Sequence, residues 1–159
     1  MSARNPDPAA EALTPAPISP GVADVARAFA RTWANPDIDH FMELLHRDVR
    51  LTQPLSPPIL GKPAARREFE RMFRLFPNLH GEVDHWSADG DYLMIAWRLR
   101  AAIGRDLYEW RIADHLRVEG GLIIERDALY DSIALMTKVL RSGPSAWVKS
   151  MKLLGWLKE

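Results

Sequence analysis

The chain has 159 residues, of which 47% are hydrophobic, so it is long enough and apolar enough to bury the core of one globular domain. Lysine plus arginine equals aspartate plus glutamate, at 21 each, and this balance argues against a nucleic-acid-binding protein. The absence of cysteine excludes disulfides and thiol chemistry. With no apolar run of roughly 18 residues and no apolar leader, we expect a cytoplasmic protein.

The five histidines show no metal-ligand spacing, and no glycine-rich phosphate loop is present. We therefore expect neither a metal nor another cofactor.

Prolines recur along the first twenty residues, so we expect residues 1–20 to form a disordered tail. Apolar residues then recur at helical spacing and predict three helices, over 22–34, 38–46 and 63–76. Asn35-Pro36 separates the first two helices, and Pro63 suits the first turn of the third.

Alternating segments predict a short strand at 49–53 and a meander of four strands, at 79–87, 91–102, 107–118 and 122–130. A helix over 132–140 follows. These elements predict an α+β domain over 21–140, in which three N-terminal helices cover the concave face of a cone-shaped, curved antiparallel sheet and enclose a pocket. We expect residues 141–159 to form a separate amphipathic helix that packs on the pocket mouth or on a partner subunit rather than on a membrane.

One aspartate lies on the apolar side of a predicted strand. Residues 110–118 alternate strictly, and Asp114 shares a face with Trp110, Ile112, Leu116 and Val118. A carboxyl group in such surroundings must be paired, be protonated or line a cavity. It is therefore either a general acid or base with a raised pKa, or a structural aspartate bonded to an arginine.

Arginine side chains are expected beside Asp114. Alternation places Arg98 and Arg100 on one face of the neighbouring strand, where they either bind a substrate carboxylate or phenolate, pair with Asp114, or reach the rim. On the last strand, Arg126, Ala128 and Tyr130 share the inward face, and Arg126 is a further candidate for binding the substrate.

Further candidates for the pocket are a histidine, a glutamine and several large side chains. His85 is either a second acid or base or a residue of the rim. Gln53 either orients a substrate oxygen or caps its loop. The large side chains either stack on a cyclic substrate or belong to the core: Trp33, Met72, Phe76, Trp110, Ile112 and Tyr130.

The opposite face of strand 91–102 carries four apolar side chains: Leu93, Ile95, Trp97 and Leu99. We expect this face to be convex and to need a cover, which a homodimer would supply.

Several short motifs resemble the SnoaL-like branch of the nuclear transport factor 2-like superfamily. They are Trp33 with Asp37 and Asp39, Arg47-Asp48-Val49, Pro54, Gly61, and Gly121–Arg126 followed by Tyr130-Asp131. The resemblance covers about 22–140. It implies the cone fold and a homodimer, but not one reaction, because the fold hosts cyclases, isomerases, dehydratases, hydrolases, lyases and binding proteins.

The functional residues of related enzymes can be compared with single positions of this chain. The chain resembles limonene epoxide hydrolase in its loop and at Arg98, but Arg100 and Ala128 replace the two required carboxylates, so epoxide hydrolysis is disfavoured. The ketosteroid isomerase pattern would place its base at Gln53, which is not a base. Its second, protonated aspartate matches Asp114, as does the acid–base aspartate of SnoaL-type cyclases. A likeness to scytalone dehydratase is slight.

The resulting hypothesis is a cofactor-free lyase or isomerase that performs acid–base chemistry on a hydrophobic aromatic or cyclic substrate. Asp114 would transfer the proton, Arg98 would stabilise an anion, and Tyr130 and Gln53 would donate hydrogen bonds. The alternative is a non-catalytic small-molecule-binding protein of the same fold.

Overall fold

The computed structural model describes residues 16–103 and 106–141. The predicted C-terminal helix, apart from Arg141, and most of the predicted tail lie outside the described residues. The elements follow the chain as α2 (Val22–Ala34), α3 (Ile38–Leu44), β1 (Leu45–Thr52), β2 (Ile59–Leu60), α4 (Lys62–Leu75), β3 (His80–Asp89), β4 (Tyr92–Ile103), β5 (Asp106–Glu119), β6 (Leu122–Tyr130) and α5 (Ser132–Arg141). Nearly all of these elements are predicted by the periodicity of the sequence.

The strands form one curved sheet, in the order β2-β1-β6-β5-β4-β3. Strands β3 to β6 pair in antiparallel fashion, as a meander should, but β1 runs parallel to β6. The predicted α+β domain with a curved sheet is confirmed, and the sheet is mixed, because β1 adds one parallel pair to the antiparallel meander. Hydrophobic periodicity identifies strands, but it carries no information about the direction of a partner that is distant in sequence.

The boundary between the second helix and the first strand also differs from the prediction. Asp37 caps α3, because its carboxylate accepts hydrogen bonds from the backbone N–H groups of Asp39 and His40. The helix ends at Leu44 and β1 begins directly at Leu45, so the expected extension of this helix to residue 46 is wrong.

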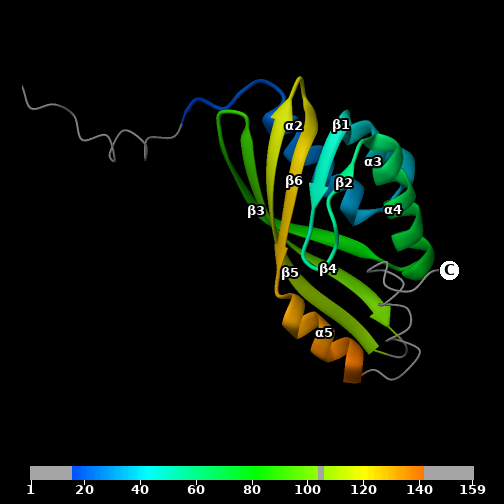
Figure 1. Cartoon of the computed structure of the whole chain (residues 1–159). Helices are drawn as coiled ribbons and strands as arrows, with labels where there is room; N and C mark the ends of the chain where they lie inside the picture. The colour runs from blue at the N-terminus through cyan, green and yellow to red at the C-terminus, as the bar shows by residue number, and fades with distance from the viewer. Residues whose placement is uncertain (1–15, 104–105, 142–159) are drawn as a thin grey trace, which may run out of the picture.

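Helices α2, α3 and α4 lie together on one side of the sheet, and α5 follows the end of β6 (Figure 1). The face of β4 that is buried carries Leu93, Ile95, Trp97 and Leu99, all at most 5% exposed. These residues pack in one core with α2 side chains such as Phe29. We refer to this helix-covered face as the inner face of the sheet and to the opposite one as the outer face.

The sequence-based assignment of the two faces of β4 is therefore reversed. The apolar residues that we expected on an uncovered convex face form the core, because burying four large apolar side chains contributes far more than turning arginines inward. The uncovered apolar face that supported a homodimer does not exist at these positions.

The segment before α2 contacts the turn between β3 and β4. The backbone N–H of Ser19 donates to the carbonyl oxygen of Gly90 at 3.0 Å, and the Ala16 N–H donates to the carboxylate of Asp89. Residues 16–20 are thus attached to the domain, although the sequence predicts a disordered tail up to residue 20. In the described part of the chain, no helix has the length and apolar character required to cross a bilayer.

Candidate functional site

Asp114 lies at the centre of the inner face and is completely buried. In the sheet register it stands between Ile95 of β4 and Ala128 of β6. The alternation of residues 110–118 thus predicts its environment correctly. A carboxyl group at such a position requires hydrogen-bond partners, because an isolated buried charge is very costly.

Two side chains supply those partners. Arg126 donates from Nε to Oδ2 of Asp114 at 2.9 Å and from Nη2 to Oδ1 at 3.1 Å, and Trp97 donates from Nε1 to Oδ2 at 3.1 Å. Arg126 is itself only 8% exposed. The three residues come from three adjacent strands, so the meander itself brings them together.

Trp97 is held in position by close packing. Its ring lies 4.6 Å from that of Trp33 and 5.5 Å edge-on from that of Phe29, measured between centroids. A Cβ atom at Gly81 would come within 2.7 Å of Trp97 Cζ3, so only glycine lets the indole lie against β3. The strand and the helix α2 together fix the hydrogen bond from Trp97 to Asp114.

Opposing effects set the pKa of Asp114. Burial raises the pKa of this carboxyl group above its ordinary value, while the charge and hydrogen bonds of Arg126 and the hydrogen bond from Trp97 act in the opposite direction. Burial is the largest of these effects, so the pKa of Asp114 is shifted upward, toward the range in which general acids and bases work. This is the property that an acid–base group needs.

Part of the Arg126 guanidinium has no protein partner. Asp114 takes one N–H of Nε and one of Nη2, and among the described residues Nη1 makes no hydrogen bond. Within that same part of the chain, Trp33 Nε1 is the one buried side-chain nitrogen or oxygen that has no partner. Nη1 is therefore not one of the fully buried atoms without a partner, so solvent reaches this nitrogen.

Tyr130 lies two positions further along the inner face of β6 than Ala128, opposite Ile112 of β5. Its hydroxyl donates to the carbonyl oxygen of Pro54 at 3.3 Å and so connects β6 to the proline-rich loop after β1. Burial raises the pKa of Tyr130, and the positive charge of Arg126 counteracts that effect. The predicted inward face of β6, with Arg126, Ala128 and Tyr130, matches the structure.

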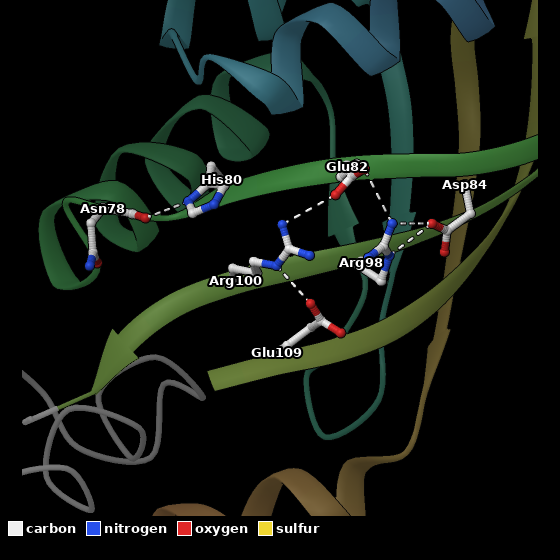
Figure 2. Close-up of polar contacts among 7 residues, drawn as sticks. All are labelled: Asn78, His80, Glu82, Asp84, Arg98, Arg100 and Glu109. Carbon is white, nitrogen blue, oxygen red and sulfur yellow. Dashed lines mark hydrogen bonds and ion pairs between the residues drawn. The ribbon is translucent and has the colours of Figure 1, made fainter. Parts of the chain in front are cut away.

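Arg98 and Arg100 lie on the outer face, so their predicted inward orientation is wrong (Figure 2). Arg98 pairs with Asp84 at 2.6 Å and Glu82 at 3.3 Å, and Arg100 pairs with Glu109 at 2.6 Å and Glu82 at 3.2 Å. We call these five residues the outer charge cluster. The predicted pairing of Arg98 with Asp114 is replaced by that of Arg126, since the apolar side of β4 faces the core.

His85 is also directed outward, and its predicted inward orientation is wrong. It is exposed and stands opposite Ala96, which belongs to the outer face of β4. The register of β3 shifts between Val83 and His85. Such a bulge interrupts the alternation of side chains between the two faces, from which the orientation of His85 was predicted. With His85 excluded, Asp114 is the one titratable candidate of the predicted catalytic set that lies deep on the inner face.

The remaining predicted residues divide between core and periphery. Trp33 and Phe76 are core residues, at most 4% exposed, and Ile112 is buried beside Trp97. Met72 and Trp110 are half-buried against the core, and Gln53 is half-buried in the loop after β1. These positions are compatible with contact to a ligand, but they are also those of ordinary core and loop residues.

Sequence reasoning missed Trp97 as a partner of Asp114. Trp97 stands two positions from Ile95, the cross-strand neighbour of Asp114, and a tryptophan at that position can reach the carboxylate diagonally. This relation was not used, since Trp97 was assigned to the wrong face. Across the described ranges, no group of three or more histidine, aspartate or glutamate side chains is arranged to hold a metal ion.

Solved structures of similar fold include a protein from Jannaschia sp. CCS1 designated a SnoaL-like polyketide cyclase, with a TM-score of 0.67 and 20% identity over 80% of this chain and 98% of that one. TerC, crystallised with polyporic acid, has a TM-score of 0.67 and 13% identity over 74% and 96% of the two chains. A Catenulispora acidiphila protein with a ketosteroid isomerase-like fold, in complex with trimethylamine, has a TM-score of 0.67 and 17% identity over 77% and 95%. At these identities the likeness concerns the fold alone.

Comparison with curated protein sequences gives no significant match. The family model of the SnoaL-like domain matches residues 26–126, which is more than half of the chain and runs from α2 to the arginine that binds Asp114. This match agrees with the mixed, helix-covered sheet and with the neighbouring structures. The chain belongs to the family of SnoaL-like domains.

Proposed function

We propose that this protein is a cofactor-free enzyme in which Asp114 transfers a proton to or from a hydrophobic, aromatic or cyclic substrate. The observation that carries the proposal is a completely buried carboxylate whose partners come from two neighbouring strands of the inner face. Isomerisation, cyclisation, dehydration and carbon–carbon lysis all require such a proton transfer, so a lyase or an isomerase is the class we propose.

The arrangement suits proton abstraction in particular. At rest the charge of Arg126 favours an ionised Asp114, while burial makes this carboxylate more basic than an exposed one. A base of this kind can take a proton from carbon next to a carbonyl group, because its basicity is raised and its orientation is fixed by two donors. Tyr130 and Gln53 remain candidates for hydrogen bonds to the substrate.

The family supports a small-molecule role. It includes polyketide cyclases, and among the neighbours of similar fold TerC was crystallised with polyporic acid and the C. acidiphila protein with trimethylamine. The homodimer and the cytoplasmic location that the sequence suggests stay predictions, because neither the fold nor the family decides them.

A specific observation favours a second candidate, a small-molecule-binding protein without catalysis. Both oxygens of Asp114 already accept hydrogen bonds, and the side chain is 0% exposed. If no substrate atom reaches these oxygens, Asp114 serves only to hold Arg126.

Exchange of carbon-bound hydrogen separates the two candidates without knowledge of the natural substrate. We expect the protein to accelerate deuterium incorporation at the acidic C–H positions of 2-tetralone in D2O, measured by NMR. Asp114→Asn should lower that rate by about 10²–10⁴, the usual contribution of a general base. Asp84→Asn, which changes a carboxylate of the outer charge cluster, is the matched control and should keep the wild-type rate. Exchange no faster than in buffer, or full activity in a folded Asp114→Asn protein, would move the assignment to the binding protein.

A further inference from the structure

We infer that the site takes an organic molecule with an oxygen that is negatively charged or becomes so during the reaction, and that Arg126 is the residue that binds this oxygen. The inference deepens the proposed function and rests on it for the location of the site. It assigns Arg126 a role toward the ligand in addition to its pairing with Asp114.

The geometry of the guanidinium is the first argument. Five N–H groups radiate from an arginine in a plane, and they form two forks that can each hold a carboxylate or a similar oxyanion. Asp114 occupies the side-on fork, formed by Nε and Nη2. The end-on fork, formed by Nη1 and the second N–H of Nη2, makes no hydrogen bond to the described residues, and solvent reaches Nη1.

The balance of charge is the second argument. When Asp114 removes a proton from carbon, the C–H bond breaks, the proton binds to a carboxylate oxygen, and the electron pair moves to the carbonyl oxygen as an enolate. The negative charge then passes from Asp114 to the substrate, while Arg126, at 8% exposure, keeps its positive charge. If the enolate occupies the free fork, Arg126 has one negative partner before and after the transfer, which avoids an unpaired buried charge.

The surroundings of Arg126 are the third argument. Its neighbours across the sheet on the inner face are Leu51 of β1 and Leu116 of β5, both at most 4% exposed. Apolar side chains around the guanidinium reduce screening by water. A charge-assisted hydrogen bond at the free fork is therefore stronger than the same bond at the surface. Tyr130 is the next polar side chain along this face, and it is close enough to Arg126 for that charge to counteract the rise that burial gives the pKa of the phenol.

A matched pair of probes tests the inference in the wild-type protein. The pair is 2-naphthoate, which carries a permanent anionic oxygen, and 2-naphthamide, which has the same shape and no charge. We expect naphthoate to bind about ten- to one-hundred-fold more tightly by calorimetry, the range for a charge-assisted hydrogen bond. Equal affinities, or no binding of naphthoate at millimolar concentration, would overturn the inference.

Variants assign the preference to Arg126. In Asp114→Asn, the guanidinium loses its internal counter-charge, so naphthoate should bind more tightly than to wild type even though proton exchange is lost. A purely structural arginine would not produce this gain. The double variant Asp114→Asn/Arg126→Gln replaces the ion pair with two amides and should lose the preference for naphthoate, whereas Arg98→Gln should keep it.

The outcomes distinguish this inference from the proposed function. A preference for naphthoate without hydrogen exchange supports the anion site and rejects catalysis. Exchange without the preference supports Asp114 as a base and overturns the role of Arg126. If Asp114→Asn fails to fold, a rise in naphthoate affinity of the wild type as Asp114 takes up a proton at lower pH replaces that measurement, and a flat profile counts against the inference.

Discussion

The two faces of the sheet use the same kinds of residues in opposite ways. On the inner face, one aspartate and one arginine form an isolated buried pair among apolar side chains. On the outer face, two arginines and three carboxylates form a cluster whose side chains are 26–55% exposed (Figure 2). Distances are similar on both faces, at 2.6–3.3 Å, so geometry alone does not separate them.

The environment makes the difference. Water screens the outer charge cluster and can replace any partner that is lost, so each ion pair there contributes little. Water cannot replace a partner of Asp114, so loss of Arg126 leaves an unpaired charge in the core. The same environment makes the inner pair the one suited to chemistry, because buried carboxylates with a shifted pKa are concentrated at functional sites.

Removal of the inner arginine should have the largest effect. We expect Arg126→Met to lower the free energy of unfolding by about 3–5 kcal/mol at neutral pH, because Asp114 remains buried without its counter-charge. The double variant Asp114→Leu/Arg126→Met should regain most of that stability, as measured by urea denaturation. A double variant as unstable as the single one would show that packing of the arginine, and not its charge, is what matters.

The pH dependence of stability should have opposite signs on the two faces. Burial raises the pKa of Asp114, so its contribution to stability is complete below its ordinary pKa and is lost as pH rises through the raised value. A hydrogen bond from Arg117 lowers the pKa of Glu125 on β6, so its contribution is present above its ordinary pKa and is lost as pH falls through the lowered value.

Two amide variants measure these signs by denaturation between pH 3 and 8. Asp114→Asn should remove a decline of stability with rising pH, and Glu125→Gln should remove an increase. If both variants change the profile in the same direction, the two faces of the sheet do not differ in the sign of their pH dependence.

The smallest effect is expected in the outer charge cluster. Arg98→Met should lower Tm by no more than a few degrees, because its ion pairs with Asp84 and Glu82 are open to solvent. Added salt should reduce the difference from wild type further, since exposed pairs are screened. A loss comparable to that of Arg126→Met, insensitive to salt, would mean that the outer cluster is as important to the fold as the inner pair.

Periodicity in the sequence is enough to predict most of the helices and strands, the α+β class and the position of the key carboxylate. Alternation over residues 110–118 placed Asp114 among apolar side chains, and alternation along β6 placed Arg126 and Tyr130 on the same face. These inferences succeed because the period of a strand is local and depends on few residues. The short motifs shared with SnoaL-like domains pointed to the family that the comparison then established.

Three features depend on contacts in the folded domain: which face of β4 meets the helices, which arginine pairs with Asp114, and where β3 shifts its register. An alternating strand shows that two faces differ, but the choice between them depends on the summed burial of residues such as Trp97 and Ile95 against α2 and β5. The bulge at Val83 and His85 and the parallel pairing of β1 with β6 depend on contacts between distant segments. For that reason the sequence identified the carboxylate of the candidate site, and only the fold identified Arg126 and Trp97 as its partners.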